Sequence, residues 1–376
     1  MSHKFSFYWL NLLFFFAGFS KAAITNFDGQ GNLKYNCQDR MVFQEVISYH
    51  KFEGKIGNSE VVMELKVTDS YISGRYFYKK IGIPISISGS LDKQRKFKIT
   101  EYTSSESSAM FIGSFVSDEL ISGNWISTDG KKNLPFSLSW SNKIGAKVFY
   151  EVKSAKYCSE VKGASKNDIL LDTACSTLEV EVIRIETSVP FLNEKINRKI
   201  TQLICGANPF GSSKNSIEEL LNSVNASGEE AGSFQSSTSV DILNNDTKIF
   251  SIAITQSDYA FGAAHPTASY LVYNFEMSSG NIIVLKDLMI NGYKKQLNAI
   301  GEKNFIKANG SEGWDFQRGN FVLNDNFSIL PGGLEFTFNQ YEIGAYAMGA
   351  PSVFIPYSQI KHLINPGGLL KDKIKK

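Results

Sequence analysis

The sequence predicts an α+β protein: an N-terminal all-β antiparallel meander, barrel-like or a twisted sheet, precedes an α+β domain with an antiparallel sheet and about three helices. Three observations support this prediction. Every second residue is apolar over residues 61–67, as a half-buried strand requires. Apolar residues recur every three or four positions over residues 192–203, as an amphipathic helix requires. The 376 residues also exceed what one hydrophobic core usually serves.

The all-β domain is predicted at residues 23–160. Alternation continues over residues 83–87 and 97–99, and a glycine followed by a small or cationic residue and then a large apolar one recurs along these strands. This unit begins at Gly54, Gly74, Gly89, Gly113 and Gly123. Glycines inside strands mark bulges, bends or close approach of backbones. We therefore expect short strands that curl toward a barrel.

A polar segment without a sustained period, residues 161–176, is the predicted linker. The α+β domain follows at 177–365, and a basic tail at 366–376 reads as a solvated, frayed end. Strand patterns are expected at 178–186, 248–255, 270–275, 282–285, 334–338 and 353–357. Helices are expected from Pro190 to Gly206, from Ser216 onward, and at about 292–308.

Residues 1–22 resemble a cleaved secretory signal peptide. A weak basic start precedes an apolar run from Phe5 to Phe19, and Ser20 and Ala22 are small residues suited to cleavage. The run is shorter than the roughly 20 residues that a spanning helix needs. We therefore expect a periplasmic or secreted protein with no transmembrane segment after cleavage. Whether it stays in the periplasm is left open by the sequence.

The charge of the processed chain argues against a nucleic-acid partner. Loss of Lys4 and Lys21 with the signal leaves 37 basic and 37 acidic residues, so the formal net charge is zero. Nucleic-acid binders carry a clustered basic surplus instead.

Four cysteines remain after cleavage: Cys37, Cys158, Cys175 and Cys205. An even count in an exported chain favours two disulfides, although three connectivities are open. We favour Cys37–Cys158 and Cys175–Cys205, because each pair then lies within one predicted domain. The alternative Cys158–Cys175 would close the linker instead.

The motifs of common catalytic and metal centres are missing from the sequence. Only His50, His265 and His362 remain after the signal, and no His-Glu-x-x-His helix, nucleophile elbow, phosphate loop or complete dinucleotide fingerprint is found. We therefore assign no catalytic residue, no metal ligand and no cofactor from sequence.

Two segments stand out as candidate sites. The first contains Gly262, His265 and Pro266 in a turn between two predicted strands. His265 is suited to general acid–base chemistry with Asp258, Glu335 or Glu342 as orienting carboxylate, or to locking the turn through backbone hydrogen bonds. We favour the structural role.

The second segment contains Tyr341, Glu342 and Tyr346 among small residues that permit close backbone approach. Glu342 either organises this loop or shares one site with His265 and Tyr346. The distance in sequence does not decide between these alternatives.

Together these segments resemble the C-terminal domain-of-unknown-function family of the lysozyme-sensing anti-sigma factor RsiV. The resemblance covers roughly residues 178–360, with a strand–helix part similar to the companion PdaC/RsiV-type domain, whereas the N-terminal β domain resembles no recognised family. One departure is Ala263, where the family commonly has a second glycine. The matching residues are Gly262, His265, Pro266, Phe336, Phe338, Tyr341, Glu342, Ile343, Tyr346, Ala347, Gly349, Ile355, Pro356 and Tyr357.

The resemblance implies binding rather than a reaction. We expect an exported bacterial, non-catalytic binding protein of the cell envelope, whose partner is a protein or a cell-wall glycan, with a lysozyme-like muramidase as the family-implied example. One alternative is an envelope hydrolase or carbohydrate-active enzyme that uses His265 with Glu342 or Asp258. Another is a structural or assembly factor of the cell surface. The sequence leaves the oligomeric state open.

Overall fold

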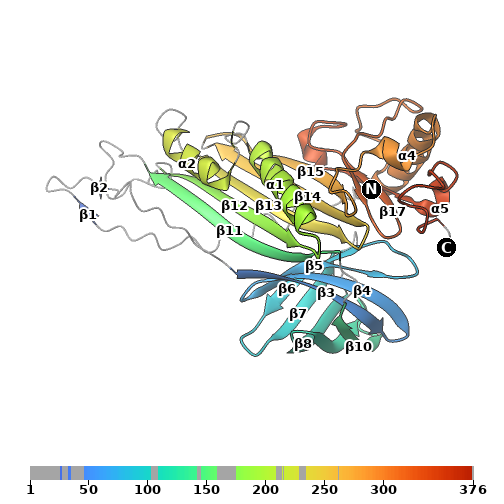
Figure 1. Ribbon diagram of the computed structural model, residues 1–376, viewed down its shortest axis with the longest axis horizontal. Coiled ribbons are helices and arrows are strands. Elements are labelled where there is room, and N and C mark those ends of the chain that lie inside the picture. The colour runs from blue at the N-terminus through green and yellow to red at the C-terminus, as the bar shows by residue number, and fades with distance from the viewer. Residues whose placement is uncertain are drawn as a thin grey trace.

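Figure 1 shows the computed structural model of the chain. The expected signal peptide, Cys37 and most of the expected linker lie outside the described residues. Among the described residues, no helix combines the length and apolar character needed to cross a membrane. The structure describes residues 26–27, 33–34, 46–102, 109–141, 145–158, 175–208, 214, 216–227, 234–260 and 262–374.

The N-terminal domain is a closed meander of eight antiparallel strands, β3 to β10, and confirms the barrel-like prediction. Each strand pairs with the next along the chain, and β10 pairs back onto β3 to close the barrel. A short hairpin, β1 (Asn26–Phe27) and β2 (Leu33–Lys34), precedes it. The barrel strands are β3 (Val46–Ile56), β4 (Ser59–Val67), β5 (Tyr71–Tyr78), β6 (Ile85–Leu91), β7 (Lys96–Tyr102), β8 (Met110–Ser117), β9 (Leu120–Ile126) and β10 (Asn133–Trp140).

Aromatic side chains and glycines explain how so small a barrel closes. The Phe111 ring lies in the core, with its centroid 5.1 Å from that of Tyr76 and 5.5 Å from that of Phe136. A Cβ atom added at Gly89 would lie 1.9 Å from the Lys98 carbonyl oxygen, and one at Gly123 would lie 2.2 Å from that of Ile112. These glycines therefore mark close backbone approach, as the sequence predicted.

The second domain is built on five further strands of the same sheet, β11 to β15, with two helices on one face (Figure 1). Neighbouring strands are antiparallel except β12 and β13, which run parallel because α1 and α2 connect them. The strands are β11 (Lys147–Cys158), β12 (Cys175–Glu186), β13 (Phe234–Asn245), β14 (Ile249–Ala260) and β15 (Thr267–Glu276). The helices are α1 (Pro190–Ala207) and α2 (Ile217–Ser227).

A C-terminal layer packs on the other end of this sheet around an aromatic core of Phe305, Phe321, Phe336 and Phe338. It contains a three-stranded antiparallel sheet, one helix of 16 residues and three short helical segments. Its strands are β16 (Phe327–Ile329), β17 (Gly333–Thr337) and β18 (Ser352–Pro356). Its helices are α3 (Leu285–Leu288), α4 (Lys294–Asn309), the 3-10 turn η4 (Tyr346–Met348) and α5 (Tyr357–Ile360).

Strand β11 was predicted as part of the N-terminal domain, but it packs with the second domain. It pairs with β12 over its whole length, and its buried residues Tyr150, Val152 and Ala155 belong to the core that α1 covers. Only Val46–Ser48 of β3 extend the pairing into the barrel. After the barrel, the change from one core to the other falls between Leu138 and Ala146, which precedes the segment 161–176 predicted as the linker.

Two local expectations are corrected. Residues 282–285, expected as a strand, form one isolated bridge at Ile282 and then begin α3. The basic tail is packed rather than frayed as far as it is described, because Leu370 is buried in the C-terminal core and Ile374 packs against it. Ion pairs Lys373–Asp246 and Lys248–Asp372 hold the tail to the β13–β14 turn.

The structure does not contain the favoured disulfide Cys175–Cys205. Cys205 is a free thiol, buried on the inner face of α1 in the core of the second domain. The backbone of Cys175 instead lies opposite Cys158 at the end of the β11–β12 ladder.

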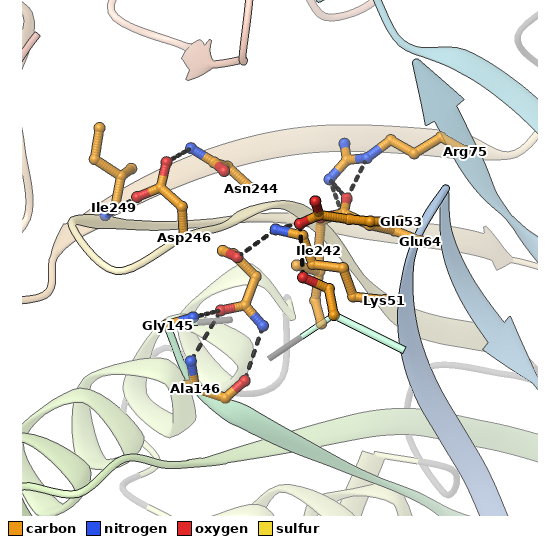
Figure 2. Close-up of polar contacts among 12 residues, drawn as sticks. Lys51, Glu53, Glu64, Arg75, Gly145, Ala146, Ile242, Asn244, Asp246 and Ile249 are labelled. Atoms are coloured by element: carbon orange, nitrogen blue, oxygen red, sulfur yellow. Dashed lines mark hydrogen bonds and ion pairs between the residues drawn. The ribbon is translucent and has the colours of Figure 1, made fainter. Parts of the chain in front are cut away.

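Buried charges join the barrel to the second domain, as Figure 2 shows. The Glu64 carboxylate accepts two hydrogen bonds from Arg75, at 2.8 and 2.9 Å, and lies 3.5 Å from the Lys51 ammonium. Both cations also donate across the junction, Arg75 to the Ile242 carbonyl and Lys51 to the Asn245 carbonyl at 2.7 Å. The excess positive charge of this cluster is thus met by main-chain oxygens of β13.

Candidate functional site

The histidine motif forms the turn between β14 and β15. Gly262 has a φ of +87°, which glycine adopts without strain. Ala263 N–H donates to the Ala260 carbonyl at 3.0 Å and closes the turn. Among the described non-glycine residues only Arg95 and Tyr341 have positive φ, so Ala263 needs no glycine and its departure from the family pattern is tolerated.

The second candidate segment leaves β17 and runs along the free edge of β15. The Asn339 side-chain oxygen accepts a hydrogen bond from the Tyr270 N–H at 2.6 Å. The Asn326 amide likewise binds the Val272 N–H and the Tyr270 carbonyl, both at 2.8 Å. These side-chain amides hydrogen-bond the backbone groups along the edge of β15, where no further strand pairs with them. They also fix the second segment beside the histidine turn.

His265, Tyr341 and Tyr346 meet in one cluster, which we call the three-ring cluster. The His265 ring stacks on the Tyr346 ring, with centroids 3.8 Å apart and planes 24° apart. The Tyr341 hydroxyl lies 3.3 Å from His265 Nε2, and the Tyr346 hydroxyl donates to the Pro266 carbonyl at 2.9 Å. The structure thus brings together two motifs that are about eighty residues apart in sequence.

The hydrogen bonds of His265 define its tautomer. Nδ1 lies 3.0 Å from the Pro266 carbonyl oxygen, which is an acceptor only, so Nδ1 carries a proton. In the neutral ring Nε2 is then the acceptor, and the Tyr341 hydroxyl donates to it. The imidazole therefore locks the turn, in agreement with the structural role that the sequence favoured, while its stacked face supports Tyr346.

Tyr341 is the exposed member of the cluster. Its side chain is 62% exposed, and its backbone has a φ of +65°. Positive φ is uncommon for a bulky residue and costs conformational energy. Glu342 stabilises this turn, because its carboxylate accepts from the Asn339 N–H and from the Asn324 amide, both at 2.8 Å.

The three carboxylates considered as partners of His265 are engaged elsewhere. Glu342 organises its own loop, as described above. Asp258 accepts from the Ser236 hydroxyl at 2.7 Å and the Gln256 amide at 2.8 Å. Glu335 accepts from the Ser352 hydroxyl at 3.3 Å. Burial raises the pKa of both the Asp258 and the Glu335 carboxyl groups.

Asp258 belongs instead to a polar cluster that sequence reasoning missed. The cluster connects the end of α1 with β13 and β14, and it consists of Asn208, Ser236, Thr238, Gln256 and Asp258. The signal in the sequence is a polar residue at every second position of both strands, 236 and 238, then 256 and 258. Four of the five side chains are buried, and they hydrogen-bond to one another, so the cluster fixes strand register rather than presenting groups to a ligand.

No candidate metal centre is found in the part of the chain that the structure describes, where no three His, Cys, Asp or Glu side chains are grouped to hold an ion.

Comparison with known families found a match for one segment of the chain. A family model described as "Protein of unknown function (DUF3298)" matches residues 286–358, from α3 to α5. Over these residues the chain is similar to that family. The matched segment contains Tyr341, Glu342 and Tyr346, whereas the turn with His265 precedes it. No curated protein matches the chain.

The comparison with solved structures found two proteins of the DUF3298 family. A DUF3298 family member from Bacteroides fragilis is 15% identical, with a TM-score of 0.51 over 62% of this chain and 100% of its own. A DUF3298 family protein from Pseudomonas aeruginosa is 13% identical, with a TM-score of 0.42 over 58% of this chain and 94% of its own. At this identity the Bacteroides protein establishes a shared fold for that part of the chain, and nothing about its activity.

Proposed function

We propose that this chain is an exported, non-catalytic binding protein of the bacterial cell envelope, with a DUF3298 domain of the RsiV-like kind. The observation that carries the proposal is the exposed Tyr341 ring, held at a positive φ and braced by His265 and Tyr346. Rigid, exposed tyrosines are typical anchors of binding surfaces, because they bury a large area at a low cost in side-chain entropy.

Charge around Tyr341 favours a cationic protein as the partner. Glu342 is exposed, and Asp315, also exposed, donates its N–H to the Ile343 carbonyl at 2.9 Å. Asp325, exposed as well, follows Asn324, whose amide binds Glu342. A lysozyme-like muramidase, which the RsiV-like resemblance implies, is such a cationic protein.

The geometry gives no support to the hydrolase alternative. That alternative requires His265 in hydrogen-bond reach of Glu342 or Asp258, directly or through one water. The hydrogen bonds of His265 go to Tyr341 and Pro266, and both carboxylates have other donors.

The test mixes the purified full-length exported protein with lysozyme and measures complex formation and the rate of cell-wall lysis. We expect a complex and slower lysis. Purified cell-wall glycan is titrated in parallel. Binding to glycan but not to lysozyme would show that the partner is a saccharide rather than a protein. If the protein binds neither lysozyme nor glycan, the proposal is contradicted. Substrate turnover that His265→Ala abolishes would contradict it as well.

A further inference from the structure

We propose that Cys158 and Cys175 form a disulfide that closes the β11–β12 hairpin, an inference that rests on the proposed export of the chain. The two strands pair antiparallel over twelve residues each, from Lys147 opposite Glu186 to Cys158 opposite Cys175. The two cysteines are therefore the last register pair before the segment that connects the strands.

The register alone places the Cα atoms of Cys158 and Cys175 at a separation that a disulfide can span. Directly opposed residues of an antiparallel pair have Cα atoms about 4.5 or 5.5 Å apart, depending on the type of pair. Disulfides span Cα separations of about 4.4–6.8 Å. The register therefore places the two backbones within the range that a disulfide spans, and the cross-link would join the two ends of the segment 159–174.

The remaining described cysteine is a poor competitor. Cys205 lies on α1, has no exposed surface and packs in the core of the second domain. Burial, together with the nearby Glu219 carboxylate, raises the pKa of its thiol, and the thiolate is the form that attacks a disulfide.

The oxidation step balances with an external disulfide as the electron acceptor. One cysteine thiolate attacks the acceptor disulfide and releases one acceptor thiol. The second cysteine then attacks the mixed disulfide and releases the other acceptor thiol. The protein loses two protons and two electrons, and the acceptor becomes two thiols. Disulfide oxidoreductases supply such acceptors in export compartments, and oxidised glutathione supplies one in vitro.

The experiment treats the purified full-length chain with oxidised glutathione, blocks free thiols, digests the protein without reduction and identifies linked peptides by mass spectrometry. We expect a Cys158–Cys175 link, with Cys205 alkylated only after denaturation. Cys158→Ala is expected to leave Cys175 alkylated, and Cys175→Ala to leave Cys158 alkylated. The Tm of the oxidised chain should fall by a few degrees on reduction, whereas that of either variant should not.

A Cys37–Cys158 or Cys175–Cys205 link, or free thiols at both 158 and 175 after oxidation, would overturn the pairing. The same digest of protein isolated directly from cells separates the two proposals. If the disulfide forms in vitro but both thiols are reduced in cells, the proposed Cys158–Cys175 pairing is supported and the proposed export of the chain is contradicted.

Discussion

At the scale of single residues, the three-ring cluster shows how a solvent-facing tyrosine is held in one orientation. His265 uses one ring nitrogen for the turn and the other for Tyr341, while its face stacks on Tyr346. The polar atoms of the cluster are thus occupied by one another and by the Pro266 carbonyl, and the exposed surface consists of the Tyr341 ring and the carboxylates beside it. Such pre-organisation lowers the entropy that binding costs.

Glu335 gives a pH-dependent prediction at the same scale. Its pKa is raised above 4.5 by burial, so ionisation is less favourable in the folded chain than in the unfolded chain. Its stabilising contribution is therefore present below pH 4.5 and is lost as the pH rises through the folded-state pKa. Glu335→Gln removes this loss and should raise the Tm at pH 7.

Thermal unfolding at pH 4 and pH 7 checks the prediction. The gain of Glu335→Gln over the native chain should be largest at pH 7 and should shrink at pH 4. The matched substitution Glu312→Gln, at an exposed position, should change neither Tm. A gain of equal size at both pH values would show that ionisation of Glu335 does not matter.

At the scale of elements, the exposed edge of β15 is protected by side chains rather than by another strand. The Asn326 side chain binds the Val272 N–H and the carbonyls of Tyr270 and Thr337, and it shares the Thr337 carbonyl with the Asn324 amide. It therefore holds the C-terminal layer, and with it the loop of Tyr341, against the sheet.

Asn326→Ala should destabilise the protein by about 1–3 kcal/mol, because it removes the side-chain hydrogen bonds to the Val272 N–H and the Tyr270 carbonyl. Urea unfolding measures the change. Asn124→Ala, at an exposed asparagine of β9, is the control and should stay within about 0.5 kcal/mol of the native chain. Equal effects of the two substitutions would mean that the edge is held by packing alone.

The elements that could be predicted from sequence are those with a strong internal pattern. The helix expected from Pro190 to Gly206 is observed at Pro190–Ala207, and the one expected at 292–308 at Lys294–Asn309. Strand β13 was missed because Ser236 and Thr238 are polar yet buried, which removes the alternation. The partners of β11 follow from tertiary pairing, which no local pattern encodes.

The candidate site could be predicted in its residues but not in its geometry. Gly262, Pro266 and the tyrosines carried local signals for turns and close approach. The contact between His265 and Tyr341 joins residues separated by 76 positions, so only the docking of Asn326 and Asn339 on β15 brings them together. The assignment of Glu342 to the loop rather than to His265 follows from the same docking.

At the scale of the whole molecule, one continuous sheet of thirteen strands runs from the barrel to β15, and buried ions reinforce the junction. Lys66 and Glu181 form a second buried ion pair across it, at 2.5 Å, and Glu181 also accepts the Val240 N–H. The two domains are therefore joined by paired backbones and charges, and we expect them to unfold together.

Glu64→Ala should lower the free energy of unfolding by about 3–5 kcal/mol, since it leaves Lys51 and Arg75 buried without their carboxylate. Asp118→Ala removes the partner of Arg95 in an exposed ion pair and should cost no more than about 1 kcal/mol. Urea unfolding of both variants provides the comparison. A cost for Glu64→Ala as small as that of Asp118→Ala would show that the charges do not hold the junction.

We propose the exposed Tyr341 ring as the binding surface, and the ratio of the lysozyme dissociation constants of variant and native chain tests this proposal most directly. Phe191, 68% exposed at the start of α1, is the matched aromatic control. We predict that Tyr341→Ala weakens binding about tenfold or more while Phe191→Ala leaves it unchanged. Unchanged binding by Tyr341→Ala, or equal losses in both variants, would contradict the claim.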